Sequence, residues 1–403
     1  MRFSFKKLFA PENFATLLLV LFCIRYIPLE TRAGPSMIKT AISGVCLLFV
    51  IFRYLHMTKA MFLGLTYFSV IFLSATMHPE SFRWSTLLYL FSFIVTYICF
   101  YNLVWIQRVF TLDKFLKILK YFIYAYIITL LIQQCFLIVG IKYFPLVNLC
   151  QVLNRGLGAN SLSGEPSTFG RILTVLVYAY IKCTEYKQGK PVTLRDMIDR
   201  DNRLVTYGYL YAVLTMGSGT AFLCIAILSL YFLRLRYAFF VVPLYIGAFL
   251  LMSHSDNASF KRLTAAIEAT MTSDTEEVWK TDTSAATRIN PMLNTINNLD
   301  FSDVETWIGH GIDWSLRDDI KRSGKRMIGE IGDYGLIAYL LGLCLVFSCA
   351  IMPFSLGTVM YFLGVGGGTG NIAYGWGLLF VFTVIRYFHN HQNDTDTETD
   401  EED

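Results

Sequence analysis

The sequence predicts an all-α, polytopic integral membrane protein of about 12 transmembrane helices, with a large external loop that contains amphipathic helices. Of its 403 residues, 55% are hydrophobic and only 16% are charged, whereas an ordinary soluble domain has about 25% charged residues. The mean hydropathy is +0.49, and apolar runs recur along the chain. Lipid must therefore be the solvent for most of the protein. A disordered chain, a secreted disulfide scaffold and a nucleic-acid-binding protein are excluded.

A transmembrane helix needs about 20 mostly apolar residues. Runs of near that length predict spans at 14–28, 37–52, 60–77, 85–105, 118–140, 166–181, 204–217, 220–233, 237–253, 328–349, 354–364 and 372–386. The pairs 204–233 and 354–386 are each interrupted by a glycine cluster, so each is a hairpin or one broken helix. We count both as hairpins. The first run contains Arg25 and lacks a small-residue cleavage site, so we interpret it as a retained span.

These spans divide the chain into nine transmembrane helices (1–253), a large external loop (254–327), three further helices (328–389) and an acidic, disordered tail (390–403). Lysine and arginine residues near the spans set the orientation. They gather in the loops that lie inside when the N-terminus is cytoplasmic, and an even number of spans returns the C-terminus to the same side. The nine cysteines lie mostly in apolar runs and form no CxxC pattern, so neither a disulfide nor structural zinc is expected.

The large external loop predicts two amphipathic helices. The first has Ser259 as a possible N-cap and an apolar face formed by Phe260, Leu263, Ile267 and Met271. The second follows Thr287 and aligns Ile289, Leu293 and Ile296. Such helices lie on the membrane surface or over the mouth of a cavity. A small packed cap is an equally good interpretation.

Glu165 and Arg171 flank the start of the span that begins at Pro166. Proline suits the first position of a helix, so Glu165 lies at the helix entrance, where a carboxylate either caps free amides or takes part in chemistry. Arg171 shares one helix face with Ser167, more than one turn into an apolar span. Because an intramembrane arginine is costly, it should face a polar cavity or a partner.

His310 stands between Gly309 and Gly311, in the external loop between Trp307 and Trp314. Flanking glycines allow tight turns and close approach of a ligand. Histidine also suits proton transfer near neutral pH. A lone loop histidine is often incidental, and we give the two interpretations equal weight.

External arginines form a third candidate group. Guanidinium binds phosphate through paired hydrogen bonds, which makes Arg155 and Arg288 candidate ligands for a lipid-linked phosphate or pyrophosphate. The later cluster of Arg317, Arg322 and Arg326 lies beside acids and is better explained as a solvated basic stretch. The sequence contains no Walker A, GxSxG or HExxH motif and no DxD-type metal pair in an external loop, so no cofactor or metal is expected.

These features together resemble the Wzy-type O-antigen and exopolysaccharide polymerases, in the superfamily that includes the O-antigen ligases. The resemblance rests on the number of spans with one long late external loop, on Gly164-Glu165-Pro166-Ser167 opening a mid-chain helix, and on the Gly217-Ser218-Gly219-Thr220 break. It also rests on Arg288 followed by Gly309-His310-Gly311 and by the segment 329–336, GEIGDYGL. Some polymerase loops have glycine eleven positions after the arginine, where this chain has Leu299.

The resemblance implies a metal-independent glycosyltransferase of the bacterial inner membrane, with both termini cytoplasmic. It would polymerise undecaprenyl-pyrophosphate-linked repeat units at the periplasmic face, alongside membrane lipid, chain-length regulator and flippase proteins. Catalysis is assigned to Glu165 and then His310, and pyrophosphate binding to Arg155, Arg171 and Arg288. Stacking on the glycan is assigned to Trp307, Trp314 and Tyr334.

Two alternatives remain open at this point. An O-antigen ligase uses the same donor with a lipid A-core or protein acceptor. A transporter or lipid-linked glycan flippase belongs to a different class and should carry charged residues along several spans and show related halves. Here the polar residues concentrate near the external face, which favours an enzyme.

Overall fold

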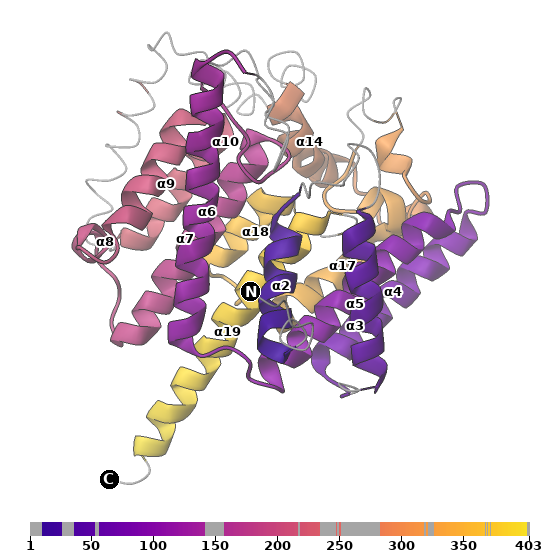
Figure 1. The fold of residues 1–403 in the computed structure, drawn as a ribbon. Helices are drawn as coiled ribbons and strands as arrows, with labels where there is room; N and C mark the ends of the chain where they lie inside the picture. Colours follow the sequence, from indigo (N-terminus) through magenta and orange to yellow (C-terminus); the bar gives the residue numbers. More distant parts are fainter. Residues whose placement is uncertain are drawn as a thin grey trace.

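The computed structural model describes residues 10–25, 36–52, 56–141, 157–216, 218–233, 247, 250, 283–317, 320, 326–366, 368, 370 and 372–400. All regular secondary structure in these ranges is helical (Figure 1). The helices are α2 (Pro11–Cys23), α3 (Met37–Phe52), α4 (Lys59–Met77), α5 (Trp84–Trp105), α6 (Leu112–Ile138), α7 (Pro166–Gln188), α8 (Leu194–Ile198), α9 (Arg203–Thr215), α10 (Gly219–Ser229), α14 (Thr283–Asn298), α15 (Val304–Ile308), α17 (Ile331–Cys349), α18 (Leu356–Val365) and α19 (Ala373–Asp400). Two short 3-10 turns, η1 (Leu230–Phe232) and η3 (Trp314–Leu316), complete the order. The prediction of an all-α fold is confirmed for the described part of the chain.

Four of the described helices are long and apolar enough to cross a membrane: α4, α5, α6 and α17. Helices α2, α3 and α18 and the segment Gly219–Phe232 are apolar but shorter. Together they make the chain a multi-pass helical membrane protein by length and composition. The predicted span 237–253 lies almost entirely outside the described residues.

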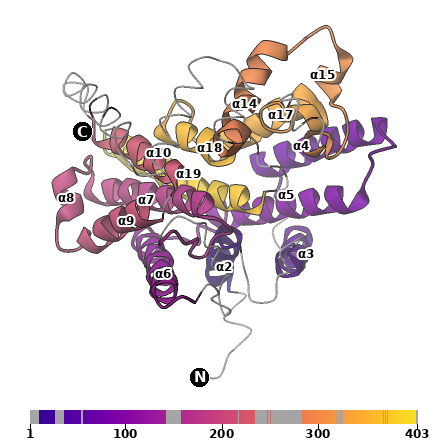
Figure 2. The same cartoon turned by 90° about the horizontal axis from the view of Figure 1, so that it is seen from above.

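The centre of the bundle is formed by α5 and α19. Figure 2 shows α19 between α18 and α7. Phe380 of α19 stacks on Phe100 of α5, with ring centroids 4.4 Å apart. Phe22 of α2 also packs against the Phe380 ring, with ring centroids 5.2 Å apart. A methyl group on Gly377 would lie only 2.8 Å from the carbonyl carbon of Phe22, so this glycine lets α2 and α19 approach backbone to backbone.

Helices α9 and α10 form a hairpin against α7, as the sequence analysis predicts. The Tyr180 hydroxyl, late in α7, donates to Asn202 at the start of α9 (2.6 Å). The other end of α9 reaches Gly170, near the start of α7, where Met216 and Ala221 both pack. From there α10 returns along α7.

The second glycine-interrupted pair, α18 and α19, is also a hairpin. Gly357 at the start of α18 faces Phe382, while Gly364 near its end faces Leu378. Because the α19 partners run backwards as α18 advances, the two helices are antiparallel. The segment 364–370, which includes the last two residues of α18 and part of the chain that leads to α19, is called the glycine loop below.

Several segments that are distant in sequence meet at the end of the bundle where α14 lies, called the α14 end below (Figure 1). Arg25, which follows α2, donates its backbone amide to Leu162 before α7 (3.2 Å). Gly329, before α17, donates to Gly366 after α18 (3.2 Å). Ser74, late in α4, donates to the carbonyl of Ile308. This convergence brings loop residues from across the chain together.

Of the two predicted amphipathic helices, the first lies outside the described residues and the second is α14. One residue of its predicted apolar face, Ile296, is 78% exposed, whereas Asn294 is 4% exposed. Polar contacts hold this helix. Asn294 donates to the carbonyl of Arg326 (3.1 Å), and the Ile328 amide donates to Thr295 (2.8 Å). Hydrogen bonds to the segment that precedes α17 therefore hold the side of α14 that carries Asn294 and Thr295.

In the structure α19 runs as helix to Asp400, into the segment 390–403 for which the sequence predicts a disordered tail. The physical reason is local. Neither glycine nor proline occurs between Arg386 and Asp400, so nothing in the chain interrupts the helix that starts in the membrane.

Replacing Gly170 with leucine is expected to destabilise the fold by about 1–3 kcal/mol, because a larger side chain must push α10 away from α7. A methyl group at this position already lies 3.2 Å from the Ala221 Cβ. The matched control is Gly44→Leu in α3, where nothing lies within 4 Å. Thermal unfolding in detergent should show a lower midpoint for the first variant only, and equal midpoints would contradict this packing.

Candidate functional site

Arg171 is held at the α14 end by three elements. Its side chain is largely buried, at 9% exposed. Nε donates to the Ser167 carbonyl one turn earlier (3.1 Å), and Nη1 donates to the Gly364 carbonyl (2.7 Å) and to the Tyr374 hydroxyl (3.1 Å). Nη2 makes only longer contacts, 3.4 Å to Thr168 Oγ1 and 3.8 Å to Glu165. The guanidinium thus ties α7 to the glycine loop and has one edge that is weakly engaged.

Glu165 is the N-cap residue of α7, but its carboxylate accepts no hydrogen bond from the helix amides. Oε1 accepts instead from the hydroxyls of Ser167 (2.9 Å) and Thr168 (3.3 Å), and it faces Arg171. The interpretation of Glu165 as an amide cap is therefore wrong. The side chain is 54% exposed, so it is accessible from the α14 end.

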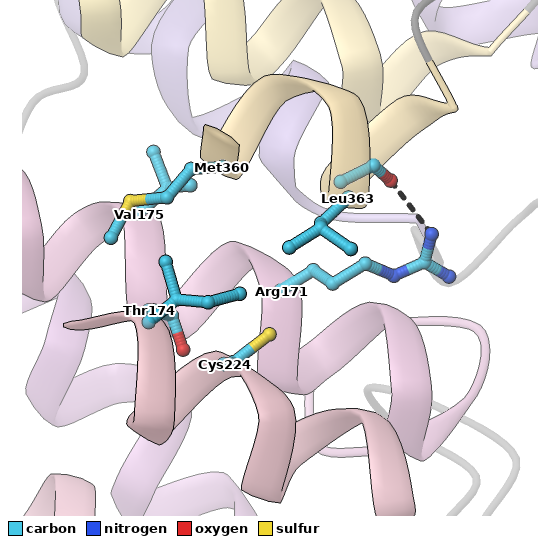
Figure 3. Close-up of a pocket in the computed structure, with 8 residues that line it drawn as sticks. Arg171, Thr174, Val175, Cys224, Met360 and Leu363 are labelled. Carbon is cyan, nitrogen blue, oxygen red and sulfur yellow. Dashed lines mark hydrogen bonds between the residues drawn. The ribbon is translucent and has the colours of Figure 1, made fainter. Parts of the chain in front are cut away.

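A small cavity lies beside Arg171, between α7, α10 and α18 (Figure 3). Its lining is apolar apart from the arginine and Thr174, and includes Cys224, Met360 and Leu363. Figure 3 shows the aliphatic part of Arg171 along this cavity and the guanidinium pointing away from it, towards the Gly364 carbonyl. The space holds little more than one water molecule, so it seats the arginine and is too small for a sugar.

The glycine loop connects Arg171 to the start of α17. The Gly364 carbonyl accepts from Arg171 and Tyr374, and the Gly366 carbonyl accepts from Gly329. A methyl group on Gly368 would lie 2.8 Å from the Gly329 Cα, so the two backbones are in direct contact. The residues around Arg171 and those around α17 therefore share one loop.

Glu330, which immediately precedes α17, lies on the other side of this loop. Its Oε2 accepts a hydrogen bond from the Tyr67 hydroxyl of α4 (3.0 Å). Its other oxygen occupies the space that a Cβ on Gly370 would need. The residue is half-buried and makes no ion pair with a basic side chain in the part of the chain that the structure describes. Burial, together with the nearby charge of Asp333, raises the pKa of Glu330 to about 7, and the Tyr67 hydrogen bond opposes this rise.

His310 lies in a loop that pairs with the first turn of α17. Its ring stacks on Trp314, with centroids 4.3 Å apart, and its Nδ1 lies 2.6 Å from Oε2 of Glu305. Its backbone amide donates to the Gly332 carbonyl (2.9 Å), and the next amide, of Gly311, donates to the Asp333 carbonyl (3.0 Å). This backbone pairing fixes the ring at the α14 end.

The three aromatic residues predicted to stack on glycan differ in exposure. Trp307 is 38% exposed and donates its indole N–H to the Phe301 carbonyl (3.0 Å). Trp314 is half-buried beneath His310. Tyr334 is only 2% exposed, the least exposed of the three. Its position in the first turn of α17 turns the ring into the protein.

The predicted site residues fall into two groups. The structure brings Glu165 and Arg171 together, and it places His310 with Trp314 across the glycine loop from them. Arg155 lies outside the described residues. Arg288 lies in α14, but its side chain is not among those the structure describes. Within the described residues no cluster of three or more His, Cys, Asp or Glu side chains is arranged to hold a metal ion.

Sequence analysis did not single out Glu330 or Tyr67. The signal available for Glu330 is its place in the segment 329–336, one position before an apolar span. For Tyr67 there is none, because its importance lies in a contact with a residue 263 positions away.

No family model, curated protein or solved structure matches this chain.

Proposed function

We propose that this protein is a polysaccharide polymerase of a bacterial inner membrane. It moves the growing glycan from undecaprenyl pyrophosphate onto the nonreducing end of the next lipid-linked repeat unit. The observation that carries the proposal is Arg171, a guanidinium buried at one end of an apolar bundle, beside an exposed carboxylate and a glycine-rich loop. A charge kept in this setting is expected to serve a function.

The proposed topology has twelve spans and both termini in the cytoplasm. The α14 end then faces the periplasm. Basic side chains near the opposite end support this orientation, among them Lys182, which pairs with Glu185 (2.7 Å), and Lys187, which pairs with Asp113 (2.5 Å). Membrane lipid surrounds the bundle, and a flippase and a chain-length regulator are the expected partner proteins.

The leaving group of this reaction is a lipid pyrophosphate, which a fixed positive charge stabilises without a metal. Nη2 of Arg171 suits this role, because its contacts with Thr168 and Glu165 are long and a phosphate oxygen can replace them. Arg155 and Arg288 remain proposed second ligands of the pyrophosphate. The exposed ring of Trp307 and the His310–Trp314 pair offer surfaces on which a sugar can stack.

The test is complementation of a bacterial strain that lacks its own polymerase, scored by the glycan ladder on a gel. The wild-type protein, supplied with a matching repeat unit, should restore a ladder of many repeats. Single repeats transferred onto the lipid core would identify a ligase instead. Lipid-linked units that cross the membrane without being joined would identify a flippase.

A further inference from the structure

We infer that Glu330 is the catalytic base that takes the proton from the acceptor hydroxyl, in place of Glu165 or His310. This inference rests on the proposed polymerase function and names a residue for the chemical step. It follows from a comparison of the contacts of Glu165 with those of Glu330.

The Glu165 carboxylate is already engaged by its neighbours on α7. Two hydroxyl groups, of Ser167 and Thr168, donate to Oε1, and Arg171 faces the same oxygen. Glu165 is therefore better suited to holding Arg171 in position.

Glu330 has the opposite surroundings. One oxygen accepts a single hydrogen bond, from Tyr67, and the other lies against Gly370. No described lysine or arginine pairs with it. With a pKa of about 7, this carboxyl group can both accept and release a proton near neutral pH.

The position of Glu330 suits a reaction at the glycine loop. The Gly329 amide donates a hydrogen bond to the Gly366 carbonyl, two residues after Gly364, whose carbonyl accepts from Arg171. On the other side, the His310 amide is bonded to Gly332. The backbone on either side of Glu330 is therefore hydrogen-bonded to both groups of the site, through Gly329 to the glycine loop that holds Arg171 and through Gly332 to His310, and the carboxylate itself lies against Gly370 of that loop.

In the proposed step, the acceptor hydroxyl oxygen attacks the anomeric carbon of the growing glycan. A new C–O bond forms while the bond from that carbon to the pyrophosphate oxygen breaks. The pyrophosphate leaves with the bonding electron pair, next to Arg171, and the hydroxyl proton passes to Glu330. No oxidation or reduction takes place, and the proton is later released to water.

The groups that face Glu330 determine how its protonation responds to pH. They are Tyr67 on α4, Asp333 and Tyr334 on α17, and Tyr361 on α18. Arg326 acts on Asp333. The carboxylate form of Glu330 increases as the pH rises through about 7, so the rate of polymerisation should rise over the same range and then level off.

The experiment uses the full-length protein in liposomes with purified lipid-linked repeat units, and follows chain growth between pH 5.5 and 8.5. Glu330→Gln should lower kcat by about 100-fold or more with little change in KM, since general bases contribute about that much. Glu330→Asp should retain part of the activity. The matched control is Glu80→Gln, an exposed carboxylate (71% exposed) on the α4–α5 loop, which should behave as wild type.

A second variant separates catalysis from a structural role. Tyr67→Phe removes the hydrogen bond that stabilises the Glu330 carboxylate, so the pKa of that group rises. The acidic limb of the rate profile should then move to higher pH. An unshifted profile, or a folded Glu330→Gln protein with most of the wild-type rate, overturns the role of Glu330 while polymerase activity stands. A wild-type protein that forms no polymer overturns both.

Discussion

Replacing Arg171 with alanine should remove polymer formation almost completely, with a loss of about 100- to 1,000-fold in kcat, the range measured when one fixed donor to a developing charge is removed. In the proposed reaction the guanidinium supplies the positive charge for the pyrophosphate, and in the structure it links α7 to the Gly364 carbonyl. Arg171→Lys should restore little, because an ammonium group places all its donors on one nitrogen and lacks the planar fork with which Nε reaches the Ser167 carbonyl, Nη1 the Gly364 carbonyl, and Nη2 remains directed elsewhere.

The chain offers a matched control in Arg386 of α19. This arginine also donates to main-chain carbonyls of a neighbouring segment, those of Phe347 and Ile351, but in the opposite half of the bundle. Alanine at either position should lower the unfolding temperature in detergent. Only the change at Arg171 should abolish the glycan ladder at equal amounts of folded protein. Equal losses of activity in both variants would show that Arg171 serves the fold alone.

Gly335→Ala is the second change with a large expected effect, and it should destabilise the docking of α15 on α17 by about 2–4 kcal/mol. Gly335 has φ +86° and ψ 170°, a region essentially restricted to glycine. A methyl group there would also lie 2.1 Å from the Trp307 carbonyl oxygen. Backbone atoms cannot rotate away as a side chain can, so α15 must move, and the His310 loop with it.

Gly140→Ala separates backbone strain from this collision. Gly140 has φ +85°, nearly the same value, but nothing lies within 4 Å of an added methyl group. Thermal unfolding should show a small loss for Gly140→Ala, from the positive φ alone, and a distinctly larger one for Gly335→Ala. Similar losses in the two variants would mean that α15 does not rest on α17 as described.

Much of the fold follows from the distribution of apolar residues. The run at 37–52 coincides with α3, and both glycine-interrupted pairs are hairpins. Hydropathy determines where a chain lies in lipid, but not where a helix ends in water, which is why the extension of α19 to Asp400 escapes it. Hydropathy also does not predict which side of α14 is buried. Asn294 is a polar residue, yet it is buried because its side chain donates a hydrogen bond to the Arg326 carbonyl.

The candidate site could be predicted only where its partners are close in sequence. Helical spacing places Arg171 on the face of Ser167, and the structure adds a bond between them. The pairing of Glu330 with Tyr67 joins α17 to α4 and cannot be derived from local pattern. The burial of Tyr334 depends on the rotation of α17 against its neighbours, which the sequence alone leaves open.

Because Arg171 is anchored by a main-chain oxygen, its partner cannot be identified by mutating side chains. Every residue has a carbonyl, so replacing the side chain at position 364 leaves the acceptor in place, and a methyl group there meets only ordinary contact with Leu378, at 3.4 Å. A scan of substitutions in α18 should therefore miss the partner of the arginine. Homologous chains can keep the contact between Arg171 and the carbonyl at position 364 whatever residue occupies position 364. Covariation between the two positions is therefore not expected.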